Sequence, residues 1–207
     1  MEKKMQKFDT GTTTVGIIGK SAVVLAADKQ ATMGYLKASK EAQKIFKLDD
    51  HVGLTIAGSV GDAQRLIRWI RSELKLYKLE ADEMSVKAVS TLLANILHSS
   101  RFMPFFNQFI TAGVDKSGPV LYDLDMGGGL MEHRDYVSTG SGSVVAYGVL
   151  EDSFKKDLND EDIIKLAIRS IKAASERDIN SGEGISVAVI GESGYKELTP
   201  KEIEKYL

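Results

Sequence analysis

The sequence contains no cysteine, only three prolines and no long apolar run. Without cysteine the chain can form no disulfide, no thiolate nucleophile and no cysteine-ligated metal centre, which fits a reducing compartment such as the cytosol. No stretch approaches the roughly 18 apolar residues of a membrane span. The polar first eleven residues also lack the apolar core of a signal peptide. We therefore expect a cytoplasmic chain that does not associate with a membrane.

An excess of charge of one sign is also missing. The 27 Lys and Arg residues and 29 Asp and Glu residues give a formal net charge of −2, which offers no bulk electrostatic basis for binding nucleic acid. His51, His98 and His133 are widely separated and lack the spacing of a zinc site. We expect neither a metal nor another cofactor. With 207 residues, 43% of them hydrophobic, the chain can bury a substantial core in one domain.

The hydrophobic pattern predicts strands and helices in separate groups. Apolar and β-branched runs predict strands over residues 12–19, 21–27, 44–48, 52–58, 107–114, 120–125, 130–137 and 184–191. Apolar residues at helical spacing predict helices over residues 63–77, 86–100, 144–154 and 160–174, the last capped by Asn159. Single strands do not alternate with helices as they do in a parallel sheet. The order instead fits two largely antiparallel sheets packed face to face, with helices on the outer faces.

Two positions near the first predicted strands could carry chemistry. Since cysteine is absent, the candidate nucleophiles are serine, threonine and lysine. Gly11 and Thr12 stand where a polar leader meets the first strand, so Gly11 is either an ordinary turn residue or part of a functional junction. Asp28 ends the apolar run VVLAA and is either a common strand-end aspartate or a functional carboxylate.

Two further positions lie at the next pair of predicted strands. Alternation places Lys44 on the more apolar face of its strand, where its ammonium either extends to solvent or meets a carboxylate. Gly58 ends a strand directly before a helix. It is either a helix-start glycine or a residue whose N–H could donate to an oxyanion.

Several sequence blocks occur together in an order that is specific to one family. They are TGTTTVGI (10–17), VVLAADKQATMG (23–34), KIFKL (44–48), TIAGSVGDAQ (55–64), TGSGS (139–143) and SERDINSG (175–182). With these blocks the chain resembles the β subunits of the 20S proteasome, most closely the archaeal type. The resemblance covers nearly the whole chain. One departure is neutral Gln30 after Lys29, where many relatives carry arginine, and it affects contacts around the site.

The resemblance implies an α+β fold of the N-terminal nucleophile hydrolase type, a four-layer αββα sandwich. It implies that residues 1–11 are a propeptide removed by autocleavage between Gly11 and Thr12, which leaves 12–207 as a single catalytic domain. Thr12 is then the nucleophile, Asp28 and Lys44 are its partners, and Gly58 is the oxyanion donor. The supporting polar residues implied in the same way are Ser141, Asp178 and Ser181.

These residue types suit the implied chemistry. The α-amine of an N-terminal threonine has an ordinary pKa of about 8 and can act as the general base for its own hydroxyl. The resemblance places substrate-binding positions at Ala31, Thr32, Ala42, Ile56 and Val60, which predicts a chymotrypsin-like preference for apolar substrate residues. Strand alternation puts Ile56 on the same face as Gly58, so Ile56 either floors this pocket or belongs to the core.

The implied assembly is a barrel of heptameric β rings stacked with α-subunit rings, fed with unfolded polypeptide by ATP-dependent or other activators. One alternative is a non-catalytic, structural β-ring subunit, although such relatives usually lack the threonine, the lysine or the processing glycine. Another is the shorter bacterial ATP-dependent peptidase with six-membered rings. The blocks at 139–143 and 175–182 disfavour that second alternative.

Overall fold

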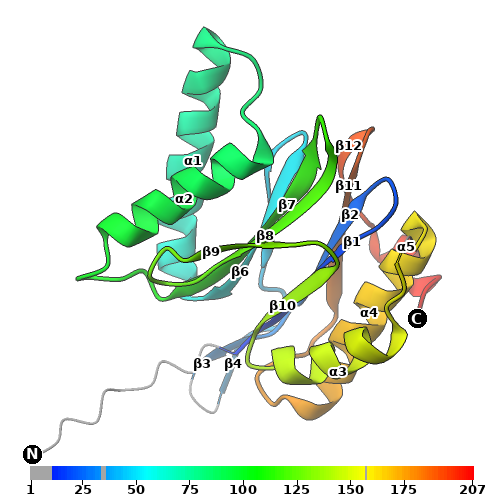
Figure 1. Ribbon diagram of the computed structural model, residues 1–207. Helices are drawn as coiled ribbons and strands as arrows, with labels where there is room; N and C mark the ends of the chain where they lie inside the picture. The colour runs from blue at the N-terminus through cyan, green and yellow to red at the C-terminus, as the bar shows by residue number, and fades with distance from the viewer. Residues whose placement is uncertain (1–10, 34–35, 157) are drawn as a thin grey trace, which may run out of the picture.

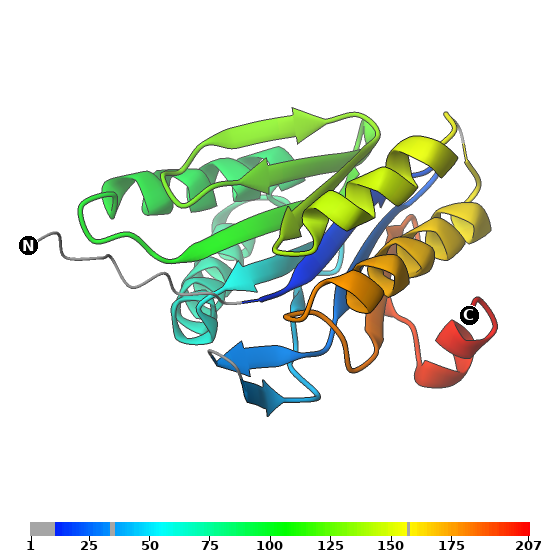
Figure 2. The same cartoon turned by 90° about the horizontal axis from the view of Figure 1, so that it is seen from below.

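The computed structural model describes residues 11–33, 36–156 and 158–207. Two five-stranded antiparallel sheets pack face to face, and helices cover the outer face of each (Figures 1 and 2). The sequence-based expectation of a four-layer αββα sandwich is confirmed. The predicted propeptide, apart from Gly11, lies outside the described residues. Within the described ranges, no helix is long and apolar enough to cross a membrane.

The first sheet has the strand order β10-β1-β2-β11-β12. Its strands are β1 (Thr13–Ile18), β2 (Val23–Asp28), β10 (Tyr136–Gly140), β11 (Ile185–Gly191) and β12 (Gly194–Glu197). All six residues of β2 are buried, because helices cover one face of the strand and the second sheet covers the other. β1 runs antiparallel to β2 with Thr14 opposite Ala27. The start of β1 and the end of β2 therefore meet at one end of the sandwich.

The second sheet has the order β5-β6-β7-β8-β9. Its strands are β5 (Ile45–Asp49), β6 (Val52–Gly58), β7 (Asn107–Asp115), β8 (Gly118–Leu124) and β9 (Leu130–His133). A separate two-stranded hairpin follows β2 and consists of β3 (Ala31–Met33) and β4 (Leu36–Ser39). This hairpin projects from the same end of the sandwich at which β2 ends (Figure 2).

Five helices complete the outer layers of the described part of the chain. They are α1 (Val60–Glu80), α2 (Val86–Ser99), α3 (Ser143–Ser153), α4 (Asp160–Arg177) and α5 (Pro200–Glu204). α1 and α2 pack on the second sheet through apolar positions such as Leu66, Ile70 and Leu93. α3 and α4 cover the first sheet. The predicted Asn159 cap is confirmed, since its side chain accepts a hydrogen bond from the Asp162 N–H at 2.9 Å.

The single strand predicted over residues 130–137 is wrong. Leu130–His133 pairs with β8 in the second sheet, whereas Tyr136–Gly140 pairs with β1 in the first. The chain bends at Arg134 and Asp135 as it crosses between the layers. A local apolar pattern cannot show this break, because residues on both sides of it suit a strand.

The sequence analysis also missed the hairpin strands β3 and β4, the edge strand β12 and the short helix α5. The three strands have only three or four residues each, and most of their side chains are at least partly exposed. α5 did carry a readable signal. Thr199 and Glu202 form a capping box around Pro200, and the segment TPKE has the spacing of that motif.

Candidate active site

Antiparallel pairing of β1 and β2 brings the residues after Gly11 against Asp28. The Thr13 N–H donates to Asp28 Oδ1 at 2.9 Å. Lys44, which directly precedes β5, reaches the same oxygen, with its Nζ 2.7 Å away. The predicted strand over 44–48 thus begins one residue later, and the Lys44 ammonium meets a carboxylate, which was one of the two interpretations of its position.

The Asp28–Lys44 ion pair is almost completely buried, with side-chain exposures of 0% and 6%. Burial lowers the pKa of Lys44, and the nearby carboxylates of Asp28 and Asp178 oppose that shift. A buried charge is costly unless it is paired and hydrogen-bonded. Asp28 meets this requirement, since its Oδ2 accepts the N–H groups of Gln30 at 3.0 Å and Gly182 at 2.9 Å.

Thr12 lies at the centre of this region and is 4% exposed. Its hydroxyl donates to the carbonyl oxygen of Gly11 at 2.6 Å, so the side chain lies beside the peptide bond that links the two residues. The Thr12 N–H donates to Ser141 Oγ at 3.2 Å. A Cβ on Gly11 would lie 1.6 Å from Asn180 Cβ, so the described conformation leaves no room for a side chain there.

A directed chain of hydrogen bonds surrounds the Thr12 nitrogen. Asp178 Oδ2 accepts the hydroxyls of Ser141 and Ser181, each at 2.6 Å. Since the single hydroxyl hydrogen of Ser181 is committed to Asp178, Thr13 Oγ1 donates to Ser181 Oγ across their 2.7 Å contact. Asp178 therefore fixes both serines and, through Ser141, the position of the Thr12 nitrogen.

Gly58 ends β6 in a conformation that requires glycine. Its φ is +141°, and a Cβ there would lie 2.0 Å from the carbonyl oxygen of Phe106. A side chain would thus be strained and would collide with backbone. Gly58 lies at the same cavity as Thr12 and Lys44.

The cavity has a volume of about 100 Å³. It is lined by Thr12, Ala31, Thr32, Ala42, Gln43, Lys44, Ile56, Gly58 and Val60. This set contains all five predicted substrate-binding positions. The volume is well below the roughly 300–1,000 Å³ of pockets that enclose drug-sized ligands, so the cavity suits a single side chain. Ile56 both lines it and packs in the core below α1 and α2.

Several site residues were missed at the sequence level. Thr13 and Gly182 each donate a backbone N–H to Asp28, and Gln43 lines the cavity beside Lys44. Gln30, which the sequence analysis noted as a departure from many relatives, is buried, and its amide donates to Thr32 Oγ1 at 3.0 Å and to the Ile179 carbonyl at 2.8 Å. Gly182 lies in the block SERDINSG, so that block carried a signal for the position without indicating its partner.

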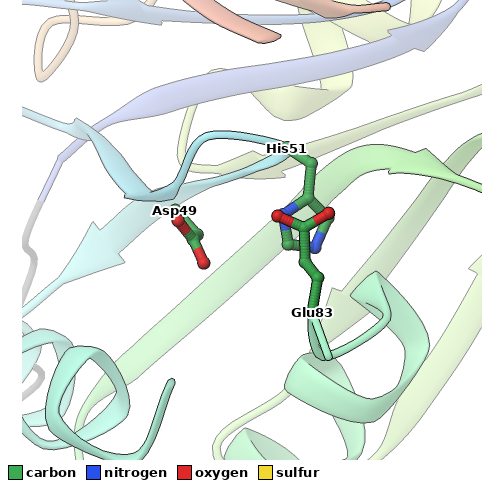
Figure 3. A group of neighbouring side chains, drawn as sticks. All are labelled: Asp49, His51 and Glu83. Carbon is green, nitrogen blue, oxygen red and sulfur yellow. The ribbon is translucent and has the colours of Figure 1, made fainter. Parts of the chain in front are cut away.

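A second cluster of titratable groups lies away from this cavity. The ligand-type atoms of Asp49, His51 and Glu83 lie within 4.8 Å of one another (Figure 3). His51 Nε2 donates to the Met84 carbonyl at 2.8 Å, and its Nδ1 is 2.9 Å from Glu83 Oε1. The Lys78 ammonium lies 2.7 Å from Asp49 Oδ2 and 3.6 Å from Glu83 Oε1. Because this lysine already supplies the positive charge, we assign the cluster to ion pairing.

Comparison with known proteins agrees with this geometry. The family model described as Proteasome subunit matches residues 8–190, a span that contains Gly11, Thr12 and all the residues that surround them here. The chain belongs to the proteasome subunit family. Proteasome subunit beta 1 of Thermococcus onnurineus is 50% identical over 198 residues, which cover 95% of this chain and 97% of that protein.

Two further relatives place the chain on the β side of the family. Proteasome subunit beta of Methanocaldococcus vulcanius is 52% identical over 199 residues, covering 95% of this chain and 89% of the relative. Proteasome subunit beta of Ferroglobus placidus is 52% identical over 202 residues, covering 97% and 96%. The chain is therefore a proteasome β subunit of the archaeal 20S type, as its sequence blocks suggested.

Proposed function

We propose that this proteasome β subunit is catalytic and acts as a threonine endopeptidase. The observation that carries the proposal is the position of Thr12. Its hydroxyl lies at the Gly11–Thr12 peptide bond, and it shares one cavity with the buried Lys44 ammonium and Gly58. A subunit with only a structural role would not need the buried Lys44 ammonium, or a backbone conformation at Gly58 that only glycine adopts, beside Thr12.

Maturation would begin with attack of Thr12 Oγ1 on the Gly11 carbonyl carbon. The C–N bond breaks, the nitrogen takes up the hydroxyl proton, and Gly11 becomes an ester of the Thr12 side chain. Water then hydrolyses the ester and releases residues 1–11 with a Gly11 carboxylate. The free α-amine of Thr12 remains beside Ser141, where its N–H already donates a hydrogen bond. Residues 12–207 would form the mature domain.

In the mature subunit the freed amine would act as the general base for the Thr12 hydroxyl. The Lys44 ammonium would stabilise the negative charge that develops on Oγ1, with Asp28 holding it in place. The Gly58 N–H would donate to the oxyanion of the tetrahedral intermediate, a contribution of about 3–4 kcal/mol in serine enzymes. Ser141, Ser181 and Asp178 would position the amine. The substrate C–N bond then breaks, its nitrogen takes up the proton from the Thr12 amine, and the C-terminal peptide leaves while the N-terminal part stays as an ester on Thr12. Water hydrolyses this ester and releases the second peptide with a carboxylate end.

The substrate would be an unfolded polypeptide with an apolar residue before the cleaved bond. Ala31, Ala42, Ile56 and Val60 give the cavity an apolar lining. Burying a substrate Leu or Phe there gains about 1.5–3 kcal/mol, whereas an unpaired charge is costly to bury.

In the cell, we propose cytoplasmic heptameric β rings stacked with α-subunit rings and served by ATP-dependent or other activators.

The decisive test compares assembled wild type with Thr12→Ala. Wild-type particles should lose residues 1–11 and show an N-terminus of TTTVG. They should also cleave the bond between a C-terminal Leu or Tyr and the attached reporter group in fluorogenic peptides. Thr12→Ala particles should form the same rings, keep the precursor mass and have no activity. A fully active particle that retains residues 1–11 would refute the proposal, since its Thr12 nitrogen would still be an amide. Seven-fold symmetry in negative-stain images separates this assembly from the six-fold bacterial alternative.

A further inference from the structure

Glu183 has a backbone conformation that its residue type does not favour. Its φ is +60°, and it is the only non-glycine residue with positive φ in the described ranges. Outside glycine, this left-handed region favours asparagine and aspartate, and a longer side chain is strained there. Gly182 and Gly184 flank Glu183 and also have positive φ. A glycine at position 183 would avoid this strain, so we expect the Glu183 side chain to make a contact that offsets it.

The Glu183 carboxylate reaches the β3–β4 hairpin. Its Oε1 lies 2.7 Å from Lys37 Nζ in β4, and its Oε2 lies 3.7 Å from Lys40 Nζ just after that strand. The Glu183 side chain is 21% exposed, whereas the lysines are 56% and 73% exposed. The Glu183 carboxylate is therefore more enclosed by protein than either ammonium, and the two lysine side chains reach it from the hairpin.

The backbone around Glu183 belongs to the site. The Gly182 N–H donates to Asp28 Oδ2, and the Lys29 N–H donates to the carbonyls of Gly182 and Gly184 at 3.0 and 3.1 Å. Glu183 thus projects from a segment whose position is fixed by the carboxylate that pairs with Lys44. The hairpin and this segment lie side by side in both views (Figures 1 and 2).

The hairpin in turn supplies a wall of the cavity through Ala31 and Thr32. β3 and β4 pair only with each other and form a sheet of their own, so no strand ladder joins them to either large sheet. We infer that Glu183 is a positioning residue that fastens this substrate-binding wall to the segment holding Asp28. It acts through Lys37 and Lys40 and does not touch the reacting atoms.

This inference rests on the proposed peptidase function and predicts a specific kinetic effect. If the hairpin wall of the cavity becomes more mobile, substrate binding should weaken, whereas Thr12 and Lys44 should keep their positions. In Glu183→Gln, which keeps the side-chain length but removes the charge, KM for a Leu- or Tyr-ending peptide should rise three- to tenfold with kcat within twofold. Raising the ionic strength should increase KM in the wild type and have little effect in Glu183→Gln, because salt screens exposed charges.

Glu183→Gly separates the fastening role from a simple structural one. It removes the carboxylate and also the backbone strain, so KM should rise as in Glu183→Gln while the melting temperature stays equal or increases. Lys37→Met should raise KM by a similar factor, and the Glu183→Gln/Lys37→Met pair should not be additive, since both changes break one contact. Glu161→Gln is the matched control. It breaks the exposed Glu161–Lys165 pair on α4 at 2.7 Å and should leave KM unchanged.

Amide hydrogen exchange gives a readout independent of activity. In Thr12→Ala particles, adding Glu183→Gln should accelerate exchange in β4 at least threefold and leave β6 unchanged. Unaltered β4 exchange together with wild-type KM in both Glu183 variants would overturn the inference while the peptidase proposal stands. Wild-type particles without Thr12-dependent activity would instead refute the peptidase proposal, and the exchange experiment would still decide whether Glu183 fastens the hairpin.

Discussion

Gly11 and Asn180 are in contact so close that only a glycine fits at position 11. A Cβ there would lie 1.6 Å from Asn180 Cβ and 2.7 Å from Asn180 Cα. Because the second of these atoms belongs to the backbone, the Asn180 side chain cannot relieve the overlap by rotating. The segment after α4 therefore constrains the residue that precedes Thr12, although 169 positions separate Gly11 from Asn180 in the sequence.

Gly11→Ala should therefore slow maturation. The added Cβ must displace the Gly11 carbonyl from the Thr12 hydroxyl, and we expect the half-time of precursor cleavage to increase at least tenfold. This half-time can be measured from the intact mass of the subunit in assembled particles as a function of time. Gly61→Ala is the control, because a Cβ at Gly61 meets nothing within 4 Å and should leave the half-time unchanged. Equal cleavage of Gly11→Ala and wild type would show that the contact with Asn180 is unimportant.

Lys44→Met should abolish both maturation and peptide hydrolysis, with a loss of at least 100-fold in kcat. It removes the ammonium and leaves Asp28 as a buried carboxylate without its cationic partner, which also destabilises the fold by about 3–5 kcal/mol. Lys44→Arg should retain the fold better and still be poorly active, because a planar guanidinium does not replace a compact ammonium. Activity and thermal unfolding of the same samples separate the two effects.

A matched lysine lies three residues further along. Lys47 forms an exposed ion pair with Asp50 and does not line the cavity beside Thr12. Lys47→Met should leave activity and stability close to wild type. Normal turnover in Lys44→Met would contradict the role that we give to this residue.

The pH dependence of activity should reveal the buried lysine. Burial lowers the pKa of Lys44 below its ordinary 10.5, so the ammonium is lost at lower pH in the folded protein than in the unfolded chain. Activity should therefore decline on the alkaline side before pH 10.5. The fold should persist there, because the neutral Lys44 amine can still donate a hydrogen bond to Asp28, which a Met side chain cannot. In addition, a lowered lysine pKa opposes folding below that pKa, and this opposition is relieved as pH rises towards 10.5.

The profile of kcat/KM between pH 7 and 11, with circular dichroism at each point, tests this expectation. Lys44→Arg provides the control, since guanidinium does not titrate in this range. Its residual activity should lack the alkaline decline attributed to Lys44. An identical decline in both proteins would assign it to another group.

The apolar cavity should decide which residue precedes the cleaved bond. Fluorogenic peptides with Leu or Tyr directly before the reporter group should be cleaved faster than those with Arg or Glu at that position. Val60→Asp places a carboxylate at the cavity wall, at an exposed position in the first turn of α1 that favours an anion. This variant should raise the Arg-to-Leu ratio of kcat/KM at least tenfold. An unchanged ratio would show that Val60 does not contact the substrate side chain.

Much of the framework could be predicted from local sequence. The strand β6 was predicted with its observed bounds, because its apolar run ends at a glycine followed by a helix pattern. Asn159 was predicted as a cap because it precedes three acidic residues and an apolar helical stripe. Alternation placed Lys44 on the more apolar face of its strand and left two possibilities, extension to solvent or a carboxylate partner, of which the structure shows the second. The resemblance of sequence blocks supplied what local patterns could not, the pairing of Lys44 with Asp28 and Thr12.

Other features depend on contacts between distant segments. No local pattern shows that the strand-like stretch 130–137 divides between two sheets, because the division depends on which neighbour each half pairs with. The Gly182 N–H completes the hydrogen bonds of Asp28 from 154 positions away. Glu183 looks like an ordinary loop residue in the sequence, and only its φ and its lysine partners distinguish it.

The sequence by itself determined the layers of this protein and the chemical character of its site, because hydrophobic periodicity and residue type act locally. It supplied a threonine after a glycine, an aspartate at the end of an apolar run and a lysine on the more apolar face of a predicted strand. The tertiary structure alone decided how these groups are held. It set the Thr13 and Gly182 N–H groups that bind Asp28, the glycine required beside Asn180 and the hairpin that walls the cavity, because each depends on segments that come together only in the folded chain.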